Sequence, residues 1–241
     1  MRQIWDDDPN EDEALWRYFK TARFITFLET SHLYFAAATQ FEDRFEGCVA
    51  VQSPEYKTDP RYAEKEHAEE AFAELKRLTK ISCWHRADYE SYAMWKLYAE
   101  FHKGVAVETT VHTLVHSVAP FNLQPNYGEE TLLGGAIRYT DMTQVRLKTS
   151  MEKRFFHKHQ AFAWEREYRL AISVRNAEEF GVSVPSEGIL VSVDPSRMIK
   201  RIILGPRLPE SERETITNAA NAAGLSDRVA LSSLLYNPRY V

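Results

Sequence analysis

The chain has 241 residues, of which 44% are hydrophobic and 27% are charged, and its formal net charge is −5 at pH 7. This composition is typical of a globular protein that buries a sizeable core, and the length fits one large domain. The negative charge argues against a surface that coats nucleic acid, so a nucleic-acid partner is not favoured. The two cysteines form no CxxC pair, so neither a disulfide framework nor a cysteine-rich zinc site is implied.

The sequence also lacks the signals of a membrane protein. No apolar stretch approaches the length of a membrane span. The acidic N-terminus does not follow the basic-then-apolar order of a signal peptide. We therefore expect a cytoplasmic protein without a membrane partner.

The first third of the chain predicts a strand, a helix and a second strand. Residues 1–13 are acidic and read as a solvated loop. Alternation then predicts a strand over residues 15–19, and apolar residues at helical spacing predict a helix over residues 22–30, with Thr21 as its N-cap. Residues 33–36 read as the second strand.

The next segment, residues 41–47, concentrates charge between two phenylalanines. It contains Asp43 and Glu46 and ends on Gly47, which permits a sharp turn. Such a density of acids in a loop indicates a ligand-binding role for Asp43 and Glu46. The alternative is a charged loop whose phenylalanines fill the core.

Residues 54–80 change character. Two prolines interrupt the first part, and residues 62–80 read as a long charged helix with one thin apolar stripe. We expect this segment to be a helical insertion that faces solvent.

The rest of the chain alternates short strands with helices and contains neither a GxGxxG nor a P-loop motif. Asp88 is the expected N-cap of a helix over residues 89–101, with Gly104 at its end. The segment 153–159 reads as a basic helix. The fold class that follows is α+β, a single domain over residues 1–241 with a curved, mainly antiparallel sheet flanked by helices. Further strands are expected at 81–85, 105–110, 136–140, 168–174, 189–193, 200–206 and 229–232, and further helices at 112–117, 194–199 and 212–223.

The strongest site candidate lies where the basic segment leads into the strand at 168–174. On a strand, Glu165, Glu167 and Arg169 would share a face, because alternate residues point the same way. If a helix continues instead, Glu165 and Arg169 are one turn apart and can pair. Two carboxylates and a guanidinium are costly to desolvate unless they pair or bind something. They are therefore either an acid pair with a substrate-holding arginine or a structural ion-pair knot.

Four blocks of sequence resemble a known family. They are Leu15-Trp16-Arg17-Tyr18; Leu33-Tyr34-Phe35 with Asp43-x-Phe45-Glu46-Gly47; Ser82-Cys83-Trp84-His85 with Glu90-Ser91-x-x-Met94-Trp95-x-x-Tyr98 and Gly104-Val105-Ala106; and Lys153-Arg154 with Glu165-x-Glu167-x-Arg169. In this order they are similar to the bacterial family known as domain of unknown function 2971, over nearly the whole chain. The resemblance implies a role in defence or a toxin-like role, without a settled chemistry.

The chain also has a remoter likeness to ADP-ribosyltransferases. The resemblance implies a first-strand role for Arg17, a middle role for Tyr98 or the Ser91 region, and the role of the late E-x-E for Glu165 and Glu167. The serine-threonine-serine pattern usual in that class is absent here.

These residues suggest an enzyme acting on a nucleotide-like ligand, with NAD as substrate and no other cofactor. Glu165 or Glu167 would stabilise the reacting centre. Arg169 and Arg17 would hold phosphate, and Trp95 or Tyr98 would shape the pocket.

Two other readings stay open. A metal-dependent nuclease would hold Mg²⁺ with Asp43, Glu46, Glu165 and Glu167, and Lys153 would lie near the scissile phosphate. A non-enzymatic binding or regulatory module would use the same charges as a structural network. We expect no resident metal, and the sequence leaves the oligomeric state open.

Overall fold

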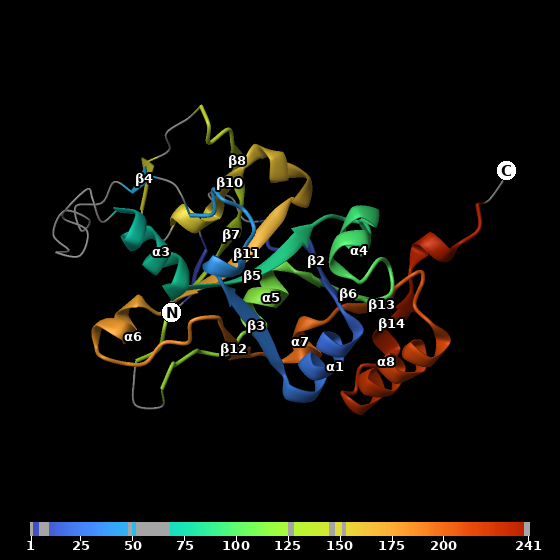
Figure 1. Cartoon of the computed structure of the whole chain (residues 1–241). Helices are drawn as coiled ribbons and strands as arrows, with labels where there is room; N and C mark the ends of the chain where they lie inside the picture. Colours follow the sequence, from blue (N-terminus) through green and yellow to red (C-terminus); the bar gives the residue numbers. More distant parts are fainter. Residues whose placement is uncertain are drawn as a thin grey trace. The chain divides into compact units, whose positions relative to one another are not determined.

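The computed structural model describes residues 2–4, 10–47, 50–51, 68–124, 128–144, 148–150 and 153–238. The chain divides into two compact units whose segments alternate along the sequence (Figure 1). The first unit comprises Met1–Pro9, Tyr34–Cys83 and Pro120–Val191, and the second comprises Asn10–Leu33, Trp84–Ala119 and Ser192–Val241. The sequence predicted a single domain over residues 1–241, and this stays a prediction.

The first unit is built on strands with few helices. Among the described residues of this unit, the helices are α3 (Ala68–Leu78) and α6 (Arg175–Glu179), and the 3-10 turns are η1 (Ala38–Gln40), η4 (Lys153–Phe156) and η5 (Gln160–Glu165). Three strands, β3, β5 and β12, cross from one unit into the other. The strands of this unit are β1 (Arg2–Ile4), β3 (His32–Ala37), β4 (Ala50–Val51), β5 (Thr79–Arg86), β7 (Leu132–Ala136), β8 (Arg138–Thr140), β9 (Lys148–Thr149), β10 (His157–His159), β11 (Glu167–Ser173) and β12 (Gly188–Ser192).

The sheet of the first unit has the strand order β1-β7-β11-β5. β11 runs antiparallel to β7, with Leu170 opposite Gly134, whereas β1 and β7 are parallel. β3 joins β5 in antiparallel fashion, with Ala36 opposite Ile81, and β12 pairs with β3. Two small parallel pairs, β10–β8 and β4–β9, lie outside this sheet.

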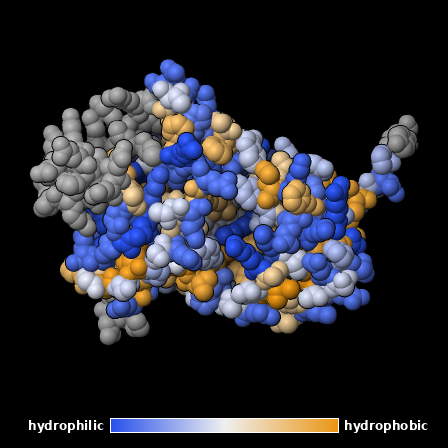
Figure 2. All heavy atoms as spheres, viewed as in Figure 1, coloured by the Kyte–Doolittle hydropathy of each residue, from blue (hydrophilic) through white to orange (hydrophobic). Residues whose placement is uncertain are grey.

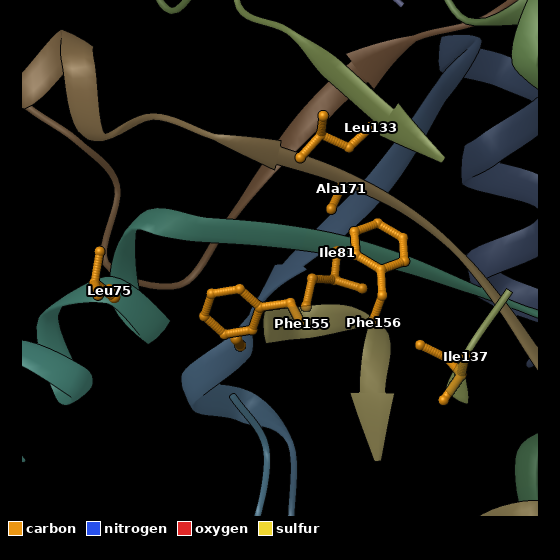
Figure 3. Close-up of a cluster of buried hydrophobic side chains, with 8 residues drawn as sticks. Leu75, Ile81, Leu133, Ile137, Phe155, Phe156 and Ala171 are labelled. Atoms are coloured by element: carbon orange, nitrogen blue, oxygen red, sulfur yellow. The ribbon is translucent and has the colours of Figure 1, made fainter. Parts of the chain in front are cut away.

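The core of the first unit gathers apolar side chains from the sheet, from α3 and from the η4 turn (Figure 3). Phe155 and Phe156 of η4 are 2% and 4% exposed, so they are core residues although they directly follow the basic pair Lys153-Arg154. Burying each such side chain is worth about 1.5–3 kcal/mol. The other members are Ala38, Leu75, Ile81, Leu133, Ile137 and Ala171.

The second unit combines a sheet with most of the helices (Figure 1). Within it, β6 runs antiparallel to both β2 and β13, and β13 and β14 are parallel. The C-terminal part of β5 pairs with β2 through Leu15 and Trp16. The elements are β2 (Ala14–Phe19), β6 (Val105–Thr110), β13 (Arg201–Leu204), β14 (Val229–Leu231), α1 (Thr21–Thr30), α4 (Tyr92–Tyr98), α5 (Val111–Ser117), α7 (Pro195–Met198), α8 (Glu210–Ala222), η6 (Ser226–Arg228) and η7 (Ser233–Leu235).

The fold class predicted from the sequence is confirmed: the chain is α+β, with a mixed, mostly antiparallel sheet. Hydrophobic residues also reach the surface, where they lie in small groups among hydrophilic ones (Figure 2). In the part of the chain that the structure describes, no helix is both long and apolar enough to cross a membrane.

Two boundary predictions near the N-terminal half are corrected. Residues 2–4 form β1 and pair with β7, so the acidic segment 1–13 is not loop throughout. The helix expected over residues 62–80 is α3, which ends at Leu78, because Thr79 and Lys80 already belong to β5. Residues 52–67, which include the rest of the expected insertion, lie outside the described residues.

The predicted helix 89–101 is shorter than expected. α4 begins after Ser91, whose side chain accepts a hydrogen bond from the backbone N–H of Met94, so Asp88 is not its cap. The helix ends at Tyr98, and Glu100, Phe101 and His102 all have positive φ, at 49°, 56° and 76°. Left-handed backbone cannot continue a right-handed helix. Gly104 therefore does not cap α4.

The caps of α1 and the basic segment also differ from the sequence prediction. Thr21 is the first residue of α1 rather than its N-cap. Residues 153–159 form the turn η4 followed by β10, not one helix. On β10 the burial alternates, and Lys158 points inward between two half-buried histidines. The inward-pointing Lys158 pairs with Glu165 and Glu167 in a buried network.

Candidate functional site

Arg169 is the centre of a buried charge network in the first unit. It lies on β11 two residues from Glu167, so the two side chains share a face of the strand. Arg169 Nη1 and Nη2 donate to Glu46 Oε1 and Oε2 at 2.6 and 2.9 Å, and Nε and Nη2 donate to Glu167 at 2.6 and 3.2 Å. A fifth bond runs from Nη1 to the carbonyl oxygen of Phe155 at 2.6 Å. A guanidinium has five N–H donors, so these bonds use its full capacity.

Lys158 extends the network from β10. Its Nζ donates to Glu165 Oε2 and lies 3.4 Å from Glu167 Oε2. Glu165 is the last residue of η5 rather than a strand residue, and Arg166 after it has φ of 43°. The network thus joins three carboxylates to two cations, and none of the five side chains belongs to a residue more than 7% exposed.

The electrostatics of the network favour its charged form. Burial opposes the charge of Glu167, but Arg169 and Lys158 outweigh it and hold the pKa of Glu167 below its usual value. Burial likewise opposes the charge of Lys158, and Glu167 together with Glu165 raises the pKa of Lys158. Glu167 and Lys158 are therefore ionised together over the physiological pH range.

Two further groups border the carboxylate of Glu167. Burial, with the charge of Glu167, raises the pKa of the Cys83 thiol well above its usual value, so this thiol stays protonated. The hydroxyl of Tyr139 accepts a hydrogen bond from the backbone N–H of Glu167 at 2.8 Å. Cys83 is thus poorly suited to nucleophilic chemistry.

The loop that supplies Glu46 is held by its own turn. The Asp43 carbonyl accepts from the backbone N–H of Glu46 at 3.1 Å, and Asp43 Oδ1 accepts from the N–H of Phe45 at 2.9 Å. Gly47 has φ of +65°, as a sharp turn requires, and its carbonyl accepts from Arg154 Nε at 2.6 Å. A Cβ on Gly47 would lie 2.6 Å from the Phe155 ring. Asp43 therefore positions Glu46.

The sequence-predicted residues Glu46, Glu165, Glu167 and Arg169 do converge, but they converge on one another. Arg169 has no N–H left for a phosphate, and each of the three glutamates is bound by a cation. Across the described residues, no group of three or more His, Cys, Asp or Glu side chains is arranged to hold a metal ion. This geometry suits the ion-pair knot better than the catalytic acid pair.

The remaining predicted residues belong to the second unit. Arg17 lies on β2 with its guanidinium carbon 5.3 Å from the ring centre of Phe19 and 5.6 Å from that of Trp84. Trp95 is fully buried, packs edge-on against Tyr18 at 5.0 Å, and donates its indole N–H to Glu90 at 2.9 Å. Tyr98 is 44% exposed at the end of α4. Trp95 is thus a core residue of the second unit.

The segment after α4 carries features that the sequence did not reveal. Phe101 is 66% exposed, whereas its neighbour His102 is only 3% exposed. The ring of Tyr92 lies 4.5 Å from the ring of His102, and Lys96 follows Tyr92 by one helical turn. The His102 carbonyl accepts from the backbone N–H of Arg207 at 3.0 Å. We call Tyr92, Lys96, Phe101, His102 and Arg207 the α4 surface.

His102 is the unusual member of the α4 surface. Its Nδ1 is buried and has no hydrogen-bond partner among the described residues. Burial lowers the pKa of His102, and the nearby charges of Arg207 and Lys96 lower it further. The ring is therefore neutral near pH 7, and its centre lies 4.5 Å from that of the exposed Tyr92 ring. A buried polar atom without a partner normally carries a free-energy cost.

The sequence analysis did not identify Lys158, Tyr92, Lys96, His102 or Arg207 as functional residues. The alternation His157-Lys158-His159 is a strand pattern that could have indicated the inward lysine. No local pattern indicates three consecutive left-handed residues without glycine.

Comparison with known proteins adds no relative to this description. No protein-family model matches the chain, and no curated protein and no solved structure matches it.

Proposed function

We propose that this chain binds a nucleotide-like ligand, one with a flat ring and an anionic group, on the α4 surface. The observation that carries the proposal is His102, a buried neutral histidine whose Nδ1 has no partner among the described residues. Because this atom is buried, a ligand reaches it only when a covering side chain moves aside, and a hydrogen bond made there removes the cost of leaving the atom unsatisfied.

The residues around His102 suit the two halves of such a ligand. Tyr92 and Phe101 are 60% and 66% exposed and offer ring faces on which a base can stack. Lys96 and Arg207 are exposed cations whose charges already reach the His102 ring. Together they favour an anion that carries an aromatic group over a neutral aromatic compound.

Backbone strain supports the same location. Glu100, Phe101 and His102 occupy the left-handed region, which costs a non-glycine residue about 1–2 kcal/mol. Strained residues persist where the surrounding structure over-determines them, and such positions cluster at binding sites. Here the strain presents Phe101 to solvent and buries His102.

The same proposal treats the network around Arg169 as structural, and so favours a binding or regulatory module over the NAD-consuming enzyme and the nuclease. No geometry among the described residues favours either reaction, because the required carboxylates are already bound by Arg169 and Lys158. A cytoplasmic location and a defence setting belong to this proposal as the expectations from the sequence and the resemblance.

Calorimetric titration with AMP, adenosine and ribose 5-phosphate tests the proposal. AMP should bind, and the two fragments should bind more weakly, because each lacks one half of the recognised group. Tyr92→Ala should weaken AMP binding by about 1–3 kcal/mol, the usual worth of one stacked base. Lys96→Gln should weaken binding in low salt and have less effect in high salt, because salt screens exposed charge.

Two matched variants control for general damage. Phe180→Ala removes an equally exposed ring from the first unit, and Arg23→Gln removes an exposed cation from α1. Both should bind AMP as the unaltered chain does. Absence of AMP binding, or an equal loss in Phe180→Ala, would refute the α4 surface. Release of nicotinamide from NAD that Glu167→Gln abolishes would move the function to the network of the first unit.

A further inference from the structure

Two histidines of the second unit lie one turn apart on α5. His112 and His116 are residues i and i+4 of this helix, so they share a face. Their ring centres are 4.2 Å apart and the ring planes are inclined by 26°. The His112 and Glu11 side chains are 50% and 57% exposed, so this face of α5 is open to solvent.

Hydrogen bonds fix which nitrogen of each ring carries the proton. His112 Nδ1 lies 3.2 Å from Glu11 Oε2, and His116 Nδ1 lies 2.8 Å from the backbone carbonyl oxygen of His112. A carboxylate and a carbonyl only accept hydrogen bonds, so both Nδ1 atoms are the donors. In the neutral rings the lone pair is then on Nε2 of both residues.

Glu11 is held in place for this contact. Its carbonyl oxygen accepts from the backbone N–H of His112 at 2.9 Å, and the carbonyl oxygen of Glu13 accepts from the N–H of Val111 at 3.1 Å. The segment before β2 is therefore bonded to the first residues of α5 by main chain as well as by side chain.

We propose that His112 and His116 form a binding site for a divalent transition-metal ion, with both Nε2 atoms as ligands and Glu11 as the carboxylate that orients His112. Paired histidines at i and i+4 of a helix are a recurring zinc-binding arrangement. A carboxylate on the far nitrogen of a ligating histidine fixes the ring and increases its basicity. Neutral imidazole suits Zn²⁺, Ni²⁺ and Cu²⁺ rather than Mg²⁺ or Ca²⁺.

This site needs only two protein ligands, and Glu11 acts through His112 rather than on the ion. It is consistent with the finding that no group of three or more metal-binding side chains is present among the described residues. Catalytic zinc sites use three protein ligands and one water, so here water or another molecule fills two positions of a tetrahedral ion. The proposal does not depend on the α4 surface, and neither result decides the other.

Zinc titration of the untagged chain, followed by calorimetry and by NMR of the imidazole nitrogens, tests the site. One equivalent of Zn²⁺ should bind, with the largest shifts at Nε2 of His112 and His116. His116→Ala should remove most of the affinity because a single imidazole remains. Glu11→Gln should weaken zinc binding about 10-fold or more, as loss of an orienting carboxylate does.

His32→Ala is the matched control. His32 also belongs to the second unit, but its Nδ1 contacts the Thr30 carbonyl and its Nε2 contacts Ser192 Oγ at 2.9 Å. It should bind zinc as the unaltered chain does, and far-ultraviolet circular dichroism of every variant should remain unchanged. The proposal is overturned if zinc does not bind, if His116→Ala binds zinc unchanged, or if the shifts appear at Nδ1.

Discussion

Two polar sites, the network around Arg169 in the first unit and His102 in the second, differ in how far their hydrogen-bonding groups are satisfied. In the first unit, Arg169 donates all five N–H groups to Glu46, Glu167 and a carbonyl group. Lys158 forms ion pairs with Glu165 and Glu167. In the second unit, His102 is buried with its Nδ1 unused by the described residues. The first arrangement is saturated, whereas the second retains capacity for a further hydrogen bond.

The difference separates charge density from binding capacity. A dense group of acids and bases attracts attention in a sequence, but a cluster whose members satisfy one another has little left for a ligand. Buried ion pairs of this kind are weak evidence for stability, and removing one partner is strongly destabilising. A single unsatisfied atom beside an exposed ring is less conspicuous, yet it keeps the capacity to form a hydrogen bond with a ligand.

Of the substitutions considered, replacing Arg169 should cost the most stability. Arg169→Met leaves Glu46 buried without its guanidinium partner and leaves Glu167 paired with a single cation, Lys158. We expect the free energy of unfolding to fall by about 3–5 kcal/mol, the usual cost of breaking a buried ion pair. Urea denaturation followed by circular dichroism measures this loss.

Arg166→Met is the control for that loss. Arg166 is exposed and three residues away, and methionine keeps its unbranched side chain. Its stability should change by no more than about 0.5 kcal/mol, as for other surface substitutions. The double variant Arg169→Met/Glu46→Gln should be less destabilised than the sum of the two single variants, because the stranded charge is gone. Full additivity would mean that Arg169 and Glu46 are not coupled.

The sequence predicted the fold class and most strands, but not how the charges around Arg169 pair with one another. The α+β class and most strands were predictable, because alternation and β-branched runs are local signals, as in residues 105–110 and 168–174. The convergence of Glu46 with Glu167 and Arg169 was anticipated as a shared site, although 123 residues separate Glu46 from Arg169. Which group satisfies which could not be read from the sequence, because that depends on an inward-pointing Lys158 that looked like part of a basic helix.

The α4 surface could not be predicted for a different reason. Asp88 and Gly104 have the residue types of helix caps, but the helix is set by Ser91 and by the left-handed residues after it. A Cβ on Gly104 would lie 2.0 Å from the Phe19 carbonyl oxygen, so tertiary packing requires that glycine. Asp88 and Gly104 therefore have the residue types of helix caps, but neither residue caps α4.

Glu130 is a buried carboxyl group of the first unit that has no such cation beside it among the described residues. Glu130 is 7% exposed, its Oε1 makes no hydrogen bond to the described residues, and burial raises its pKa to about 7 from 4.5. The folded state then binds the proton more tightly than the unfolded state, so stability falls as the pH rises from about 4.5 to about 7. Above that range the full cost of the buried charge remains.

Glu130→Gln removes this cost because the amide does not ionise. Relative to the unaltered chain, the variant should gain about 1–3 kcal/mol of stability on going from about pH 5 to about pH 8.5. The neighbouring exposed residue provides the control, because Glu129→Gln should show no such pH-dependent gain. Denaturation of the three chains at both pH values makes the measurement. Parallel pH profiles for Glu130→Gln and the unaltered chain would show that Glu130 ionises without penalty.

The smallest expected effect tests the strain beside His102. Glu100 has φ of 49°, a conformation that glycine adopts without steric cost, and it is exposed. Glu100→Gly should therefore stabilise the chain by up to about 1 kcal/mol, whereas Glu100→Ala should not, because alanine keeps the clash of a Cβ atom. Both variants lose the 3.9 Å contact between Glu100 and Lys20, so the difference between them isolates the backbone term. If glycine and alanine prove equally stable, the left-handed residues store no strain, and the case for the α4 surface rests on His102 and its neighbours alone.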